Sequence, residues 1–335
     1  MIHIKIYVPS YFKNFKCIAD KCPDTCCAGW EVNLDESSAE YYRTVGGITG
    51  EKLKRHLAYD SDGDPVFTLT DDNRCPFLDR NNLCELYISL GEKSLCPTCT
   101  LFPRFYDDFG DFREMGLGLG CPEAARIILG SGKPVTLEEY GETESSSEEP
   151  DTELLSFLLR ARSRIFEIAD DESLAFKEKI SEILDYAEKI QSELTEVEPV
   201  SVRSDFSRCT DILSEMEYID NERKVHFTTL TDEGFDKSIY ISYSTDFEKL
   251  LKYYIYRYFL KSVCDYDVLT KVKYGIFACA VIGRSYAVKK NPDFEERVKI
   301  MYGYSKETEY SDVNLDILDC ELYESFSSED LIELF

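Results

Sequence analysis

The sequence predicts a mainly α-helical protein, in which an irregular, metal-stabilised, cysteine-rich N-terminal region is followed by an α-helical domain. Nine of the thirteen cysteines lie within residues 17–121. Beyond residue 152, apolar side chains recur at three- and four-residue steps, which is the spacing of an amphipathic helix. Residues 136–151 are rich in Glu and contain no Lys or Arg. We therefore expect a cysteine-rich metal or iron–sulfur domain (1–135), an acidic linker or loop (136–151) and a mostly helical domain (152–335).

The N-terminal region carries few signals of regular structure. Pro and Gly interrupt it at short intervals, and two short helices are expected, at Glu36–Thr44 and Leu83–Leu90. A region of this kind buries little apolar surface, and a bound metal commonly supplies the missing order. In the helical domain the apolar steps predict helices at 154–168, 176–194, 206–216, 247–263 and 274–288, with a strand-like piece at 224–230.

Composition limits the possible classes of function. The apolar fraction of 43% is sufficient for a folded core. With 38 Lys and Arg against 65 Asp and Glu, the net charge is −27, which opposes binding to nucleic acid or to an anionic membrane. No stretch reaches the ~18 apolar residues of a membrane span, and the N-terminus lacks the apolar segment of a signal peptide. We therefore expect a cytoplasmic protein that binds neither nucleic acid nor membrane.

The early cysteines are the candidate metal ligands. Without a signal peptide they are expected to be reduced thiols and not disulfides. The three histidines, His3, His56 and His226, lie outside the cysteine groups, so a metal site would be nearly all thiolate. Such soft ligands select zinc or an iron–sulfur cluster over hard cations. The candidate ligands are Cys17, Cys22, Cys26, Cys27, Cys75, Cys84, Cys96, Cys99 and Cys121.

Spacing favours some of these nine cysteines over others. The segments Cys96-Pro-Thr-Cys99 and Cys22-Pro-Asp-Thr-Cys26 each place two sulfurs within reach of one metal. Nine thiols are compatible with two four-ligand zinc sites or with one cluster, so spacing alone leaves zinc and iron–sulfur open. The best candidates within the set are Cys22, Cys26, Cys75, Cys84, Cys96 and Cys99. The later Cys209, Cys264 and Cys279 are expected to pack in the core, and Cys320 is uninformative.

Three features beside the cysteines each have two interpretations. Trp30, the only tryptophan, either shields a metal from water or belongs to the core. Arg104 has two possible roles: bidentate binding of a carboxylate or phosphate, or a surface ion pair. The glycine-rich run 116–120 lacks the context of a dinucleotide site and is expected to be a flexible approach to Cys121. No Ser/His/Asp or Cys/His arrangement is visible, so catalytic and cofactor-binding residues are unassigned.

These ordered motifs resemble the flagellin lysine-N-methylase family. The resemblance covers about residues 8–130, and its core is also similar to the broader class of zinc- or iron-chelating cysteine domains. The segments that carry it are Val8-Pro-Ser-Tyr11, Phe15-Lys-Cys17-Ile18, Cys22-Pro-Asp-Thr-Cys26-Cys27-Ala-Gly-Trp30, Cys75-Pro-Phe-Leu78, Leu83-Cys84, Leu95-Cys96-Pro-Thr-Cys99, Phe102-Pro-Arg104 and Cys121-Pro-Glu123.

The resemblance implies an enzyme that methylates flagellin lysine side chains, with S-adenosylmethionine as methyl donor and a [4Fe–4S] cluster. It therefore favours iron–sulfur over zinc. The C-x3-C-x2-C triplet of most radical S-adenosylmethionine enzymes is missing, because Cys27 follows Cys26 directly. Both polar and radical methyl transfer thus stay open. The alternatives are a non-catalytic, zinc-stabilised binding module and a carrier that hands on iron or zinc.

Overall fold

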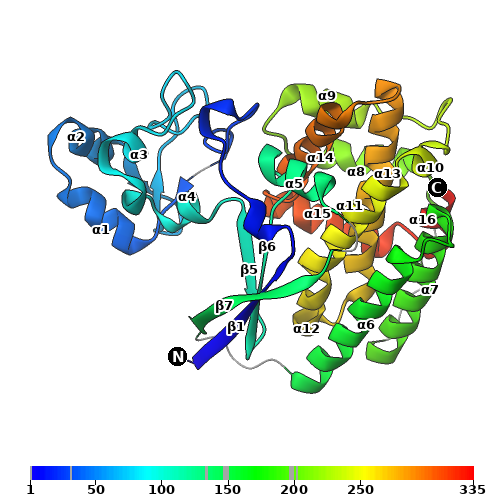
Figure 1. Ribbon diagram of the computed structural model, residues 1–335. Helices are drawn as coiled ribbons and strands as arrows, with labels where there is room; N and C mark the ends of the chain where they lie inside the picture. Colours follow the sequence, from blue (N-terminus) through cyan, green and yellow to red (C-terminus); the bar gives the residue numbers. More distant parts are fainter. Residues whose placement is uncertain (1, 31, 133–134, 146–150, 196–199, 201–202) are drawn as a thin grey trace.

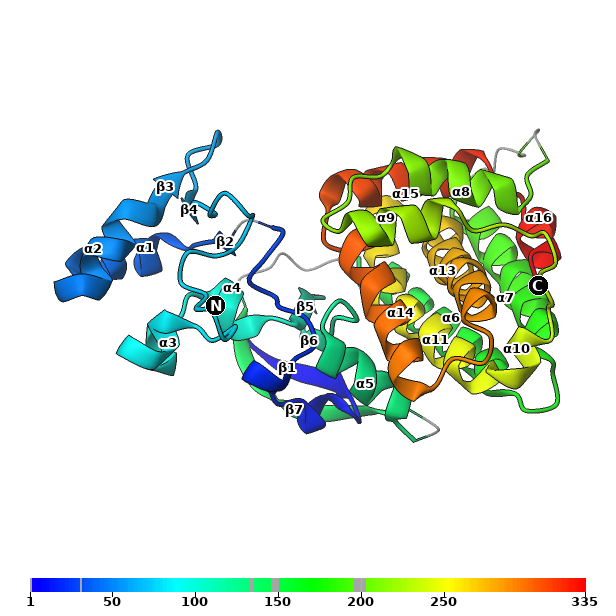
Figure 2. The same ribbon diagram turned by 90° about the horizontal axis from the view of Figure 1, so that it is seen from above.

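The computed structural model describes residues 2–30, 32–132, 135–145, 151–195, 200 and 203–335. Over these residues the protein is mainly α-helical, as predicted, and it also contains two small β-sheets that the sequence did not predict. Figures 1 and 2 show a four-stranded sheet between a small lobe of short helices and a large helical bundle. Every helix in the described part of the chain is too short or too polar to span a bilayer.

The central sheet joins the start of the chain to residues more than a hundred positions later. Its strands are β1 (Ile2–Pro9), β5 (Arg104–Asp108), β6 (Phe112–Leu117) and β7 (Leu137–Ser145), in the order β5-β6-β1-β7. Strand β1 runs parallel to β6 and antiparallel to β7, while β5 and β6 form an antiparallel hairpin. Ile4, Ile6 and Val8 of β1 are buried and the residues between them less so, which is the alternation of a half-buried strand.

Strand β7 corrects the prediction of a linker or loop at 136–151. Leu137–Ser145 pairs along the whole length of β1. Its Glu side chains stay largely exposed at the edge of the sheet, where Glu139 and Glu138 form ion pairs with Lys5 and Lys13. An exposed edge strand needs no apolar face of its own, so its sequence resembles that of a solvated loop. The run at 146–150 lies outside the described residues.

The small lobe spans residues 32–101 and has its own apolar core. Its elements are β2 (Val32–Asn33), α1 (Glu36–Thr44), α2 (Gly47–His56), β3 (Leu57–Tyr59), β4 (Pro65–Phe67), α3 (Glu85–Leu90), η3 (Glu92–Ser94) and α4 (Pro97–Leu101). Both short helices predicted here are present, as α1 and α3. The core packs around Tyr42, Phe67 and Phe77, and it includes the side chains of Cys75 and Cys96.

The five helices predicted for the helical domain are all present, and the bundle contains further helices that were not predicted. Its elements are α5 (Pro122–Gly130), α6 (Thr152–Asp170), α7 (Phe176–Leu194), α8 (Phe206–Glu215), α9 (Asn221–Thr228), α10 (Ile239–Ser242), α11 (Ser244–Tyr258), η4 (Phe259–Lys261), α12 (Ser262–Asp265), α13 (Val268–Lys289), α14 (Phe294–Thr308), α15 (Asp312–Glu324) and α16 (Ser328–Glu333). The strand-like piece predicted at 224–230 is wrong. Asp220 caps α9 by accepting hydrogen bonds from the amides of Glu222 and Arg223, which starts a helix there.

A single large core connects the sheet to the bundle. It includes Val8 of β1 and Leu117 of β6 together with side chains of α6, α7, α11 and α13. Helix α13 is buried along most of its length, so it forms the centre of the bundle. The core therefore continues across residue 135, although the division into a cysteine-rich and a helical domain stays a prediction.

Candidate metal-binding cysteine site

Four of the nine predicted ligands lie in one segment between the small lobe and the bundle. We call residues 17–28 the cysteine loop; it follows η1 (Phe12–Asn14), contains η2 (Ala19–Lys21) and carries Cys17, Cys22, Cys26 and Cys27. Figure 1 shows this early part of the chain beside the small lobe and facing the ends of α5 and α14. Cys17 and Cys26 are exposed, and Cys22 and Cys27 are half-buried.

A partly buried ion-pair network attaches the cysteine loop to the bundle. The Asp24 carboxylate lies 2.7 Å from Nη2 of Arg223 and 3.1 Å from Nζ of Lys306. Nζ of Lys306 also donates a hydrogen bond to the carbonyl of Thr25 at 2.8 Å. Arg223 forms a second ion pair, with the carboxylate of Glu307 at 3.0 Å. Burial acts to raise the pKa of Asp24, but the charges of Lys306 and Arg223 outweigh it and lower that pKa. The carboxylate is therefore held ionised against two cations of α9 and α14.

Trp30 completes this contact at the end of the loop. Its ring stacks on Tyr310, with centroids 5.4 Å apart, and its indole N–H donates to the carbonyl of Cys26 at 2.9 Å. The ammonium of Lys306 lies 4.9 Å from the ring centroid. Phe102 contacts both aromatic rings. Trp30 thus fixes the backbone of Cys26 against the bundle, which is a structural role beside the candidate ligands.

The glycine-rich run 116–120 packs tightly, which corrects the prediction of a flexible approach to Cys121. A Cβ atom at Gly118 would lie 2.0 Å from the hydroxyl of Tyr310, and one at Gly120 would lie 2.5 Å from its ring. A Cβ at Gly116 would meet the ring of Phe105 at 2.3 Å. These glycines are needed because aromatic rings lie directly against the backbone.

The structure divides the nine cysteines into two neighbouring groups. The first group lies at the edge of the small-lobe core and contains Cys27, Cys75, Cys84, Cys96 and Cys99. The amide of Cys75 donates to the carbonyl of Cys27 at 2.7 Å, which joins the loop to the lobe. A hydrogen bond between the Cys96 and Cys99 thiols lowers the pKa of Cys96 and raises that of Cys99.

The second group contains Cys17, Cys22, Cys26 and Cys121. Burial raises the pKa of Cys121 to about 12, and the nearby Cys22 and Cys26 add to the effect. Cys26 connects the groups, because its sulfur lies 3.9 Å from that of Cys27. The cysteine loop therefore contributes ligand candidates to both groups.

Four of the cysteines share a local pattern that the sequence analysis did not use. Each is followed by Pro, and each sulfur accepts a backbone hydrogen bond from the residue two positions later. Pro has no N–H and a fixed φ, so the next amide is the first that is able to turn back toward the sulfur. Such N–H donors stabilise a thiolate and tune iron–sulfur centres. The four are Cys22, Cys75, Cys96 and Cys121.

The donor chemistry of these groups fits a soft metal or an iron–sulfur centre. The nine side chains are all thiols, and backbone amides point at four of the sulfurs. Among the described residues, however, no three His, Cys, Asp or Glu side chains are close enough together to hold a metal ion. Metal binding and the choice of ligands therefore stay predictions.

The four later cysteines lie away from both groups. Cys209 and Cys279 are fully buried in the bundle core, as predicted. Cys264 is exposed, so the prediction that it packs in the core is wrong; it lies in the short α12, which ends the apolar stretch at the surface. Cys320 is exposed on α15.

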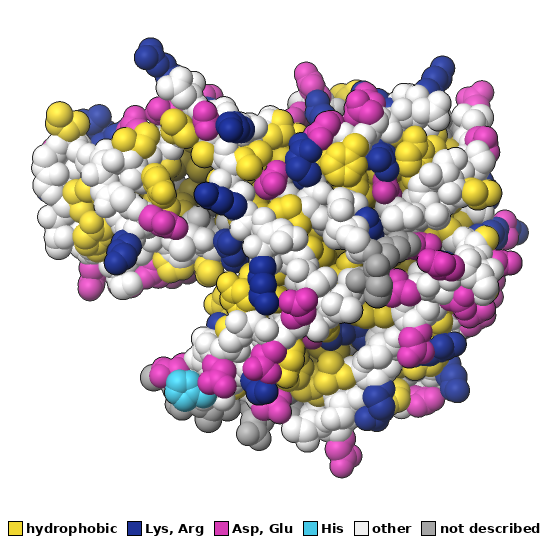
Figure 3. Space-filling model, in the orientation of Figure 1, with side chains coloured by type: hydrophobic (Ala, Val, Ile, Leu, Met, Phe, Trp, Pro, Cys, Tyr) yellow, Lys and Arg dark blue, Asp and Glu magenta, His cyan; other side chains and the backbone are white. Residues whose placement is uncertain are grey.

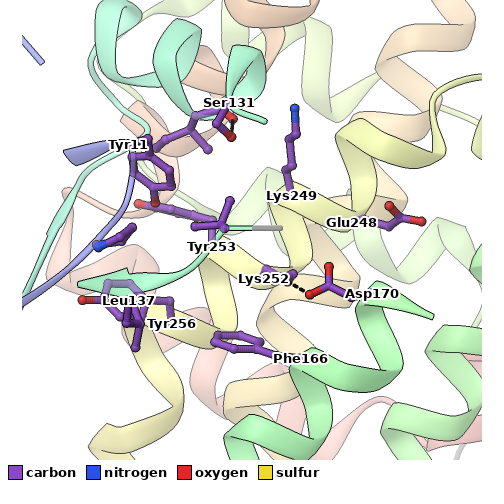
Figure 4. A pocket seen from close by; sticks show the side chains of 13 residues that line it. Tyr11, Ser131, Leu137, Phe166, Asp170, Glu248, Lys249, Lys252, Tyr253 and Tyr256 are labelled. Carbon is purple, nitrogen blue, oxygen red and sulfur yellow. Dashed lines mark hydrogen bonds and ion pairs between the residues drawn. The ribbon is translucent and has the colours of Figure 1, made fainter. Parts of the chain in front are cut away.

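A small hollow with about 30 Å³ of free space, room for about one or two water molecules, lies between the sheet and the bundle. Figure 4 shows the rings of Tyr11, Phe166, Tyr253 and Tyr256 around it, with Lys252 paired to Asp170. Its free space is sufficient for water and too small for a ligand in this conformation. Tyr253 connects this hollow to the cysteine region, because its hydroxyl accepts a hydrogen bond from the amide of Leu119, two residues before Cys121.

Glu309 holds the hydroxyl of Tyr253 in place. The Glu309 carboxylate accepts hydrogen bonds from three tyrosine hydroxyls and forms an ion pair with an arginine: Tyr253 at 2.9 Å, Tyr254 at 3.1 Å, Tyr258 at 3.0 Å and Arg257 at 3.2 Å. Burial raises the pKa of each of these tyrosines, so their hydroxyls stay protonated donors. The hydrogen-bonded cluster around Glu309 was not predicted from sequence, because the tyrosines of α11 have the spacing of an apolar helix face.

Comparison with known proteins gives matches of moderate identity. The flagellar biosynthetic protein FliU of Salmonella muenchen is 28% identical over 144 residues, which cover 42% of this chain and 85% of FliU. A lysine-N-methylase of Salmonella typhimurium is 28% identical over 144 residues, and one of Salmonella choleraesuis is 29% identical over 147. Each of these two matches covers 42% of this chain and only 36% of the relative. No solved structure matches.

A family profile covers the helical part of the chain. The profile described as the FliB lysine N-methylase C-terminal domain matches residues 163–334, about half of the sequence. This range contains Arg223 and Lys306, which hold the cysteine loop, and Glu309, which holds Tyr253. The chain belongs to the FliB lysine N-methylase C-terminal domain family.

Proposed function

We propose that this protein is an S-adenosylmethionine-dependent protein-lysine N-methyltransferase that acts on flagellin. Two relatives are named lysine-N-methylase and a third is named a flagellar biosynthetic protein. Both names agree with the activity that the N-terminal cysteine motifs imply. The heavily acidic composition also favours a partner that presents lysine side chains.

One structural observation carries the proposal to this chain. The cysteine loop is attached to the family domain through Asp24, Arg223 and Lys306. The part of the chain that matches lysine N-methylases therefore positions the segment that holds the candidate ligands. A cysteine region that served only as a separate zinc-stabilised module would need no ion pairs of this kind.

We further propose that the cysteines hold a [4Fe–4S] cluster, with zinc as the alternative. The four Cys-Pro cysteines, Cys22, Cys75, Cys96 and Cys121, are favoured because their sulfurs already accept amide hydrogen bonds. The remaining candidates, Cys17, Cys26, Cys27, Cys84 and Cys99, lie in the same two groups. A bound cluster would supply electron transfer or Lewis acidity next to the loop.

The chain's own residues would position the reactants. Trp30 and Lys306 fix the backbone at Cys26, and Arg257 and Glu309 fix the hydroxyl of Tyr253 beside Leu119. A substrate lysine has a free pKa near ~10.4 and must lose a proton before a polar methyl transfer. A base or an apolar surrounding that excludes water would favour the neutral amine.

Metal and sulfide analysis of protein purified without oxygen tests the cofactor. We expect iron and acid-labile sulfide, with a broad absorbance near ~400 nm from thiolate-to-iron charge transfer. Cys75→Ser should lose most of this signal, while Cys209→Ser, the same change at a buried cysteine of the bundle core, should keep it. Stoichiometric zinc without iron would instead favour a zinc-stabilised module, and readily exchanging metal would favour a carrier.

Mass spectrometry of flagellin tests the substrate. We expect methylated lysines in flagellin from cells that contain the gene and unmethylated lysines in a deletion strain. Complementation with the wild-type gene should restore the methyl groups, and complementation with Cys75→Ser should not. Unchanged methylation in the deletion strain would refute the flagellin assignment.

A further inference from the structure

Arg104 is a charged side chain that the proposed function does not yet use. Every other buried or half-buried arginine among the described residues has a carboxylate within 4.0 Å. Arg104 is half-buried and has neither an ion pair nor a side-chain hydrogen bond within the described part of the chain. Because Asp and Glu outnumber Lys and Arg by 65 to 38, such an unpaired guanidinium is unexpected.

Two aromatic rings hold the guanidinium of Arg104. Its central carbon lies 5.8 Å from the ring centroid of Phe12 and 5.0 Å from that of Phe15. Rings in these positions stabilise the cation and restrict its plane, but they satisfy none of its five N–H donors. The side chain is thus pre-organised as a planar donor without an acceptor. A planar carboxylate matches this geometry, because it accepts two parallel N–H bonds from a guanidinium in a bidentate contact.

The guanidinium lies against the segment that leads into the cysteine loop. Phe15 is two residues before Cys17, and Arg104 begins β5 two residues after Phe102, which contacts Trp30. On the face of the molecule drawn in Figure 3, Lys and Arg side chains lie along the middle, between the small lobe and the bundle. A carboxylate bound there would lie at the entry to the cysteine loop.

We propose that Arg104 binds the carboxylate of a ligand that reaches the cysteine loop. The inference rests on the proposed function, which offers two sources of this group. One is the amino-acid carboxylate of the methyl donor, and the other is an acidic side chain next to the substrate lysine. The surface ion pair that the sequence left open for Arg104 is absent among the described residues.

Binding measurements with two nucleosides test the first source. S-adenosylhomocysteine and its decarboxylated analogue differ only in the carboxylate, and isothermal titration calorimetry gives their affinities for the full-length, metal-loaded protein. We expect the wild type to prefer S-adenosylhomocysteine by roughly ten- to a hundredfold, as for a charge-assisted, two-pronged contact. Arg104→Gln should abolish this preference without changing the affinity for the analogue, and Arg104→Lys should keep part of it.

The control is Arg160→Gln, which removes an exposed arginine of α6 that has no ion-pair partner among the described residues. It should keep the wild-type preference. A preference that survives in Arg104→Gln overturns the assignment of the donor carboxylate to Arg104. If the wild type binds neither nucleoside, the proposed donor fails separately, and the second source is tested alone.

Peptides test the second source. One peptide carries lysine flanked by Glu, and its partner carries lysine flanked by Gln. Stronger binding of the Glu peptide by the wild type, with the difference lost in Arg104→Gln, supports a carboxylate site for the substrate. If Arg104→Gln changes neither the nucleoside preference nor the peptide preference, the carboxylate site is refuted.

Discussion

The attachment of the cysteine loop to the bundle is open to a direct test with Asp24→Asn. This change keeps the size of the side chain but removes the charge that Arg223 and Lys306 share. Lys306 has a side chain only 4% exposed, and it would keep one acceptor, the carbonyl of Thr25. Arg223 would keep Glu307.

The expected cost follows from this partial loss. Removing one partner of a fully buried ion pair costs roughly 3–5 kcal/mol. The Asp24 side chain is 18% exposed, and both cations keep an acceptor, so we expect the docking of the loop to weaken by about 2–3 kcal/mol. The bundle core does not involve Asp24 and should keep its own stability.

Trp30 makes the loss measurable, because it is the only tryptophan and lies at this contact. Its fluorescence reports whether the loop is docked on the bundle, while far-ultraviolet circular dichroism reports whether the helices are folded. In urea, Asp24→Asn should shift the fluorescence transition to lower concentration and leave the dichroism transition nearly in place. Asp20→Asn, an exposed change in the same loop, should shift neither. Equal shifts in both variants, or no shift in Asp24→Asn, would refute the role of the network.

Two further predictions concern the buried charges of the bundle. Arg162 and Glu114 form a buried ion pair with two hydrogen bonds, of 2.7 and 2.5 Å. Arg162→Met leaves the Glu114 carboxylate buried without its partner, so it should lower the free energy of unfolding by about 3–5 kcal/mol in urea. The double variant Arg162→Met with Glu114→Leu removes both charges and should lower it by clearly less. An equal loss in the double variant would contradict this. Burial lowers the pKa of Lys273 to about 8, so the unfolded chain holds this proton more tightly between pH 8 and 10.4. The contribution of Lys273 to the free energy of unfolding therefore rises with pH in that window. Between pH 7 and 9.5 the wild type should gain about 2 kcal/mol of unfolding free energy relative to Lys273→Met. If the difference between the two proteins does not change with pH, the buried ammonium is refuted.

The helices that were predicted from sequence are those with clear local signals, whereas α9, α14 and α15 were missed. In α7 the apolar steps give both ends, Phe176 and Leu194, and in α1 Asp35 caps the first turn. The central sheet was not predictable, because β1 pairs with residues more than a hundred positions away. Strand β7 in particular carries Glu at an exposed edge, and nothing in its own sequence distinguishes it from a loop.

The site was predictable in its residue types and not in its arrangement. The density of cysteines identified the region, but the two groups depend on contacts between the loop, the small lobe and Cys121. The attachment of Asp24 to Lys306 spans 282 positions, and no local pattern indicates such a pair. The Cys-Pro repetition was visible in the sequence, but its meaning depends on the amide of the residue after the proline, which donates to the sulfur.

The motifs and the family match lie on different parts of the chain, and the structure explains how the two belong together. The cysteine motifs end near residue 123, while the family profile begins at residue 163. Among the polar contacts that cross this gap are those of Asp24 with Lys306, Glu114 with Arg162, and the amide of Leu119 with Tyr253. In each contact the second partner belongs to or borders the profile range and is itself largely buried. Burying a cation such as Lys306 or Arg162 is costly, and a nearby carboxylate offsets much of that cost. The cysteine region therefore depends on the family domain for its position, and it supplies acceptors to buried polar groups of that domain.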